Sequence, residues 1–109
     1  MKIFENKETD LPLDNKRPGP ATYFYLAQIC VNSPPANGMS VGEIEKRLRV
    51  IRAISTPEPE AQLEDADFDT LKACIEDMRW LSVSQAIVDF VNYIRQGGKQ
   101  ENAVGVIGG

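Results

Sequence analysis

The sequence of 109 residues contains no histidine at all. Histidine is the commonest general base of enzymes and the commonest side-chain ligand of transition metals, so neither role can be filled in the usual way. A serine nucleophile would have to use lysine as its base, and the glycines match neither a phosphate-binding loop nor a dinucleotide-binding turn. We therefore predict a protein that is not an enzyme and that has no cofactor.

Cysteine is scarce, and the two residues present, Cys30 and Cys74, both lie in apolar runs. A free cysteine in such a setting commonly behaves as a small buried hydrophobe. A disulfide between the two residues, or a reactive thiol, is the alternative. Buried free thiols favour a reducing compartment inside the cell.

Long apolar runs and an excess of positive charge are also missing. No stretch approaches the roughly 18 apolar residues of a membrane-spanning helix, and the charged start at 1–7 does not suit a secretory signal. Twelve Lys and Arg against sixteen Asp and Glu give a net charge of −4. Because nucleic acids and anionic membranes attract positive surfaces, this balance argues against a general binder of either and favours a cytoplasmic protein.

Helical periodicity is what the chain does contain. The almost entirely apolar run 22–31, which Thr22 is placed to cap, favours a buried helix over a central strand. In the segment 40–55, Ser40 and Glu43 form a capping box at the start of a helix. Apolar residues then recur at spacings of three and four, which predicts one stripe facing the core: Val41, Ile44, Leu48, Ile51 and Ile54.

Two further helices are predicted after these. The third, at about 64–78, begins with an acidic turn, where carboxylates complement the helix dipole. The fourth begins at a capping box of Ser82 and Gln85 and ends at the glycine pair 97–98. The glycine-rich residues 98–109 are predicted to be a flexible tail.

These elements predict a mainly α fold, a compact three- to four-helix bundle of one domain. Residues 22–97 form the helical domain in this interpretation. Residues 1–21 are expected to be an irregular N-terminal arm or a short β-hairpin that turns at 14–16. Residues 58–62 are expected to be a polar linker between helices.

The acidic turn of the third helix is the strongest candidate for a metal site. Four acids cluster there, and carboxylate oxygens bind calcium and magnesium: Glu64, Asp65, Asp67 and Asp69. The spacing lacks the glycine and the distal glutamate of a calcium-binding loop. We therefore interpret the cluster as a solvated helix start and predict no metal site.

Basic side chains concentrate on the helix 40–55. Its charge is +2, four basic residues minus two acids, whereas 64–79 carries −4, two basic residues minus six acids, so the two helices would attract each other side by side. Arg47, Arg49 and Arg52 are predicted to bind a partner, with ion pairing inside the chain as the other explanation. If this helix contacts DNA phosphates, the protein is a small transcriptional regulator.

Three aromatic residues complete the predicted partner-binding set. Tyr23, Phe24 and Tyr25 are consecutive and cannot all face one core from a helix, so at least one should be exposed or cover a neighbouring subunit. Exposed aromatic side chains favour interfaces. Trp80, at a predicted corner between helices, either plugs the core or anchors an interface. We select Tyr23, Tyr25 and Trp80.

Short motifs occur in a recognisable order along residues 1–95. They are Met1-Lys2-Ile3, Ile29-Cys30-Val31-Asn32, Ser40-Val41-Gly42-Glu43 with Lys46-Arg47, Leu63-Glu64-Asp65, and Val83-Ser84-Gln85-Ala86. In this layout the chain resembles a loose group of small, mostly uncharacterised proteins encoded by tailed bacteriophages and prophages. It departs from that group by lacking a glycine-rich hairpin turn and by its longer Pro34-Pro35 loop. The resemblance implies an accessory, regulatory or assembly role, in the cytoplasm of a bacterial host or associated with the virion.

The function predicted from all these features is binding. We expect a small non-enzymatic protein–protein interaction module that acts as a homo-oligomer and that contacts itself, a host protein or a virion protein, but no membrane. A DNA-binding regulator that uses the helix 40–55 is the alternative. A nucleotide or ion binder is a third hypothesis.

Overall fold

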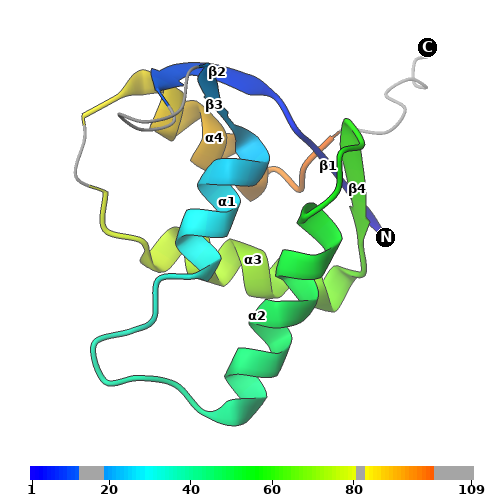
Figure 1. The fold of residues 1–109 in the computed structure, drawn as a ribbon, viewed down its shortest axis with the longest axis vertical. Helices are drawn as coiled ribbons and strands as arrows, with labels where there is room; N and C mark the ends of the chain where they lie inside the picture. The colour runs from blue at the N-terminus through cyan, green and yellow to red at the C-terminus, as the bar shows by residue number, and fades with distance from the viewer. Residues whose placement is uncertain (13–18, 81–82, 100–109) are drawn as a thin grey trace.

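A computed structural model describes residues 1–12, 19–80 and 83–99 of the chain. Within these residues the protein forms four helices and four short strands, and the strands pair in two antiparallel two-stranded sheets (Figure 1). The fold is therefore a mixed α+β arrangement, and the predicted mainly α three- to four-helix bundle is wrong. The predicted turn at 14–16, the predicted cap Ser82 and residues 100–109 of the predicted tail lie outside the described residues.

The strands explain the correction, because one of the two pairings joins segments far apart in the sequence. β1 (Lys2–Glu5) pairs with β4 (Glu60–Leu63), which occupies most of the segment predicted to be a polar linker. β2 (Glu8–Pro12) pairs with β3 (Pro20–Thr22). In β4 the residues alternate between buried and more exposed positions. A strand this short forms because its partner and its buried face stabilise it, which a local pattern cannot reveal.

The four predicted helices are confirmed. They are α1 (Tyr23–Val31), α2 (Val41–Ile54), α3 (Asp65–Asp77) and α4 (Gln85–Arg95). The hydroxyl of Thr22 accepts the N–H of Tyr25, and that of Ser40 accepts the N–H of Glu43, as the caps predict. At α4 the capping residue is Ser84, whose hydroxyl accepts the N–H of Ala86.

The helices surround one core, with α1 and α2 both packed against α3 (Figure 1). The two sheets lie at the edges of this arrangement, and β2 contacts α4. The long connection between α1 and α2 extends away from the body of the molecule, and residues 32–38 in it are exposed (Figure 1). The amino-terminal half of α2 therefore forms one end of the protein.

The amino-terminal strand contributes directly to the core. Phe4 is fully buried, and its ring centroid lies 5.1 Å from that of Phe24 and 6.1 Å from that of Tyr93. The backbone N–H of Glu5 donates a hydrogen bond of 2.8 Å to the Tyr93 hydroxyl. β1, α1 and α4 therefore meet around one aromatic cluster.

The chain after α4 returns to the same strand. Gly97 and Gly98 have positive φ angles of +99° and +83° and end the helix, as predicted. Gly98 is buried, and the N–H of Lys99 donates a 2.9 Å hydrogen bond to the carbonyl oxygen of Ile3. These first two residues of the predicted tail thus contact β1.

Candidate functional site

The face that α2 turns toward the core differs from the predicted one. Its buried residues are Arg47, Val50 and Ile54. In contrast, three residues of the predicted core stripe are exposed to solvent: Val41 by 71%, Ile44 by 42% and Leu48 by 41%. The expectation that this stripe faces the core is therefore wrong for its first three residues.

Hydrogen bonds of Arg47 explain which face of α2 is turned toward the core. The guanidinium donates to the carbonyl oxygens of Val31 at 3.2 Å and Ser33 at 3.1 Å, at the end of α1. Its Nε also donates to Glu43 at 3.1 Å. Carbonyls at the end of a helix lack partners within the helix and favour a nearby cation. With Arg47 held on this side, the apolar line that begins at Val41 faces outward.

The three arginines predicted to form one contact face point in different directions. Arg47 is only 9% exposed and is bound within the chain. Arg49 forms an ion pair of 3.2 Å with Asp67 of α3, which agrees with the predicted attraction between these helices. Arg52 is exposed and has no hydrogen bond or ion pair within the described residues. The structure therefore does not assemble the three into one surface that could follow a phosphate backbone.

We call the exposed apolar line of this helix the outer α2 stripe. It consists of Val41, Ile44, Leu48 and the half-buried Ile51. The spacings of three, four and three residues are those of the a and d positions of a heptad, the pattern with which one helix packs along another. The sequence alone does not show whether this line or the shorter apolar line of Val50 and Ile54 faces the core. The hydrogen bonds of Arg47 decide which of the two is buried.

Charged residues border one edge of the outer α2 stripe. Glu45 directly follows Ile44, and Arg52 directly follows Ile51, so both occupy the same position in successive heptads. Both side chains are exposed, and neither has an ion pair within the part of the chain that the structure describes. An exposed apolar seam with one charge of each sign along its edge is therefore available to a partner.

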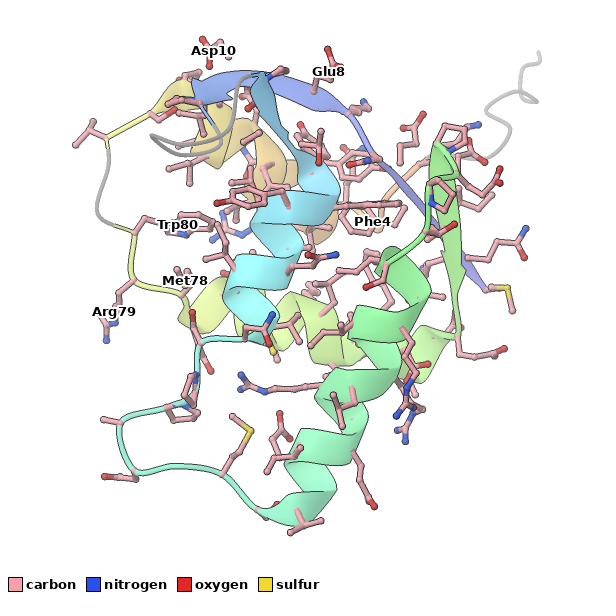
Figure 2. All side chains as sticks on the ribbon, in the orientation of Figure 1. Phe4, Glu8, Asp10, Met78, Arg79 and Trp80 are labelled. Carbon is pink, nitrogen blue, oxygen red and sulfur yellow. The ribbon has the colours of Figure 1, made fainter. Side chains whose placement is uncertain are left out.

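A groove of about 760 Å³ is lined by Arg47, by the loop that follows α1 and by the end of α3. Met78 and Arg79 line it where the chain leaves α3 (Figure 2). Cys30 and Cys74, both free and buried, also line it. Their interpretation as buried hydrophobes is confirmed.

The thiols of this groove are poorly suited to chemistry. Burial raises the pKa of Cys30 to about 12, and the neighbouring Cys74 thiol adds to this effect. Burial also raises the pKa of Cys74, although the charge of Arg47 opposes the change. Because the thiolate is the nucleophile and the metal ligand, thiols that stay protonated at neutral pH are weak in both roles.

The aromatic residues selected from the sequence occupy different environments. Tyr23 is 8% exposed, and its ring packs against Phe90 at 5.0 Å and Tyr93 at 5.2 Å between centroids. Tyr25 is half-buried. Trp80 is also half-buried and packs edge-on against Phe90, with centroids 6.4 Å apart (Figure 2). Tyr23 and Trp80 therefore both contact the core through Phe90.

Residues that the sequence reasoning missed lie around Tyr23. Glu8 and Asp10 of β2 and Asp89 of α4 share a notch with this tyrosine. No sequence signal connects them, because only the packing of β2 against α4 brings them together. These three acidic residues therefore line the same concavity as one predicted contact residue.

Two properties of the described residues and the comparisons with known proteins complete this description. Residues 1–12, 19–80 and 83–99 contain no group of three or more Asp, Glu or Cys side chains placed to hold a metal ion. No helix within them has the length and apolar character needed to cross a bilayer.

The resemblance in layout to small proteins of tailed phages stays a prediction. Comparison with protein-family models, curated proteins and solved structures finds no match for this chain.

Proposed function

We propose that this protein is a non-enzymatic interaction module that pairs with a second copy of itself through the outer α2 stripe. The observation that carries the proposal is the exposure of Val41, Ile44 and Leu48 on a helix that already contributes a separate face to the core. Burying apolar surface contributes roughly 25 cal/mol per Å². In the phage setting that the sequence layout implies, such pairing would serve an accessory or assembly role.

The spacing of the stripe supports a helix as the surface that covers it. Side chains at a and d positions fill the gaps between side chains of a facing helix. A two-fold symmetric pair uses the same patch on both copies, so a single stripe provides both halves of the interface. A second copy of α2 therefore fits this surface without any further element.

The charges along the edge favour an antiparallel pair. In an antiparallel arrangement centred on Leu48 and Ile51, Glu45 of each copy lies opposite Arg52 of the other copy. The two-fold axis produces this contact twice. In a parallel pair the two edges lie on opposite sides of the seam, so neither charge meets its complement. Charged residues that flank a helical seam commonly set its orientation in this way.

Sedimentation equilibrium at micromolar concentrations tests the pairing. We expect the full chain to form a dimer and the variant Leu48→Glu to be a monomer. Val88→Glu is the matched control, because Val88 of α4 is 48% exposed and lies outside the stripe. A wild-type chain that stays monomeric, or a dimer that Leu48→Glu leaves intact, would contradict the proposal.

A charge exchange tests the orientation. Glu45→Arg and Arg52→Glu each create two like-charge contacts in the antiparallel pair, and each should raise the dimer dissociation constant about tenfold at low salt. The double variant restores opposite charges and should return to within about threefold of the wild type. A double variant as weak as either single one would show that these residues do not face each other.

A further inference from the structure

One asparagine of the sequence is followed directly by glycine. Asn37 and Gly38 lie in the connection between α1 and α2, where all of the residues 32–38 are exposed (Figure 1). The N–H of Gly38 donates a hydrogen bond of 2.9 Å to the carbonyl oxygen of Pro35 and closes a tight turn that contains Asn37. The side chain of Asn37 forms no hydrogen bond within the described residues. Its amide group can therefore turn toward the backbone.

The backbone nitrogen of Gly38 is well placed to reach this amide. A bond from that nitrogen to Cγ of Asn37 closes a small ring, a succinimide. Glycine has no Cβ that would crowd the ring, and its backbone allows a close approach. The φ angle of Gly38 is +80°, and a Cβ at this position would have no atom within 4 Å, so the surrounding space is open. A nucleophile and an electrophile in neighbouring residues react as one unit, which favours the reaction.

The other asparagines in the described part of the chain are held by hydrogen bonds. They are Asn6, Asn32 and Asn92. Their side chains bond, in that order, to the N–H of Phe24 at 2.8 Å, the carbonyl oxygen of Gln28 at 3.0 Å and the guanidinium of Arg95 at 3.4 Å. Asn92 also lies within α4, where the backbone is fixed by helical hydrogen bonds. These three asparagines provide references within the same protein.

We propose that Asn37 is a site of spontaneous deamidation. The backbone nitrogen of Gly38 loses its proton and attacks Cγ of Asn37. A C–N bond forms there, the bond from Cγ to the side-chain nitrogen breaks, and ammonia leaves. Water then opens the succinimide at either of its two carbonyl carbons, which gives aspartate or isoaspartate. One water is consumed and one ammonia is released, with no oxidation or reduction.

The hydrogen bond between Gly38 and Pro35 slows this reaction without preventing it. The N–H has to leave the carbonyl oxygen before the nitrogen can attack. The bond lies in a loop of exposed residues, and such segments open locally at low cost. The net contribution of one typical hydrogen bond corresponds to about a fivefold effect on a rate. We therefore expect the folded protein to deamidate at Asn37 about fivefold more slowly than the chain unfolded in urea.

The modification adds negative charge at the end of the molecule that carries the start of α2. The net charge changes from −4 to −5, because a neutral amide becomes a carboxylate. Isoaspartate also lengthens the main chain of the loop by one methylene group. Asn37 belongs neither to the core nor to the outer α2 stripe. This inference therefore goes beyond the proposed pairing, since it concerns a covalent change in the loop that needs no partner.

Peptide mapping of the full chain by mass spectrometry tests the proposal. The protein is kept at mildly alkaline pH and physiological temperature, and replacement of the amide nitrogen by oxygen is followed at each asparagine. We expect Asn37 to react at least about tenfold faster than Asn32, which lies in the same exposed connection but precedes serine. Isoaspartate, identified with an isoaspartyl methyltransferase, should form together with aspartate. Equal rates at the two asparagines, or aspartate without isoaspartate, would overturn the proposal.

Matched variants test the chemistry of the site. Asn37→Gln should abolish the isoaspartate signal, because glutamine would have to form a larger ring, whereas Asn32→Gln should leave the signal unchanged. Gly38→Ala should slow the reaction about tenfold through crowding by the added Cβ. This variant is compared with the wild type in urea, where strain in the folded loop has no influence. An isoaspartate signal that survives Asn37→Gln, or a Gly38→Ala chain that reacts as fast as the wild type, would contradict the assignment.

Discussion

Arg47 is the side chain on which the orientation of α2 depends. Replacing it with methionine keeps most of the apolar stem but leaves the buried carbonyl oxygen of Val31 without its donor. An unsatisfied buried polar group costs about 1–3 kcal/mol. We expect Arg47→Met to lower the free energy of unfolding by about 2 kcal/mol, measured by urea denaturation.

Arg49 provides the control for this prediction. It is also an arginine of α2 with an acidic partner, but its side chain is 52% exposed. Exposed ion pairs contribute about 0–1 kcal/mol, so Arg49→Met should change the stability little. Equal losses in the two variants would show that the contacts of Arg47 with α1 do not stabilise the fold.

Two buried groups with raised pKa values, a thiol and a phenol, predict how the free energy of unfolding changes at alkaline pH. Burial raises the pKa of Cys30 from 9.0 to about 12 and that of Tyr93 from 10.0 to about 12. Between about pH 9 and 12 the unfolded chain therefore binds fewer protons than the folded one. Stability is complete below pH 9 and falls as the pH rises through this window, by about 1.4 kcal/mol per pH unit for each proton that only the folded state retains.

Urea unfolding in the presence of reductant, from pH 8 to 11, measures this dependence. Between pH 9 and 10 the tyrosines contribute little, so Cys30→Ala should reduce the slope there. The comparison uses the slope, because the variant also loses packing in the core. A stability that stays constant from pH 8 to 11 would contradict the prediction.

At the scale of elements, the segment that ends α4 is held by one close backbone approach. Gly98 and Gly38 have nearly equal positive φ angles, +83° and +80°. A Cβ at position 98 would collide with the carbonyl oxygen of Ile3, whereas a Cβ at position 38 would have no atom within 4 Å. Gly38→Ala should therefore cost only the backbone strain, about 1–2 kcal/mol.

Gly98→Ala adds a collision that only a movement of the backbone can relieve. We expect it to lower the free energy of unfolding by more than about 3 kcal/mol, because it combines this strain with the loss of contact to β1. Denaturant unfolding of the two variants side by side gives the comparison. Equal stability of Gly98→Ala and Gly38→Ala would show that the contact with Ile3 does not hold the segment.

The sequence predicts those elements whose determinants are local. Thr22 and Ser40 cap their helices through bonds to residues only three positions away, so the chain itself carries the signal. β1 and β4 were not predicted as a pair, because Phe4 finds its partner at Ala61. A pairing between residues that far apart in the sequence is determined by tertiary packing and not by local propensity.

The candidate surfaces were predicted only in part, for the same reason. The apolar line beginning at Val41 is visible in the sequence, but its outward direction depends on bonds between Arg47 and the end of α1. Tyr23 was selected for its place in an aromatic run, whereas its ring packs in the core against Phe90 and Tyr93 on a different helix. Local patterns thus identify the side chains, and tertiary contacts determine what they face.

At the scale of the whole molecule, Phe4 joins elements from both ends of the described chain. Truncating a fully buried phenylalanine costs about 3–5 kcal/mol, a large share of the 5–15 kcal/mol typical of a domain. We expect Phe4→Ala to lose stability on this scale in thermal and urea unfolding. Val83→Ala, at a fully exposed site, should stay within about 0.5 kcal/mol of the wild type. A small effect of Phe4→Ala would mean that β1 is dispensable.

The contact between β1 and α4 also has a consequence for synthesis on the ribosome. The N–H of Glu5 bonds to the hydroxyl of Tyr93, 88 positions later in the chain. The packing around the first strand therefore stays incomplete until nearly all of the described chain has been translated, because Phe4 also packs against Tyr93. Long-range contacts of this kind form late and expose hydrophobic surface in the meantime. A nascent chain that stalls before Tyr93 would remain a substrate for chaperones and proteases.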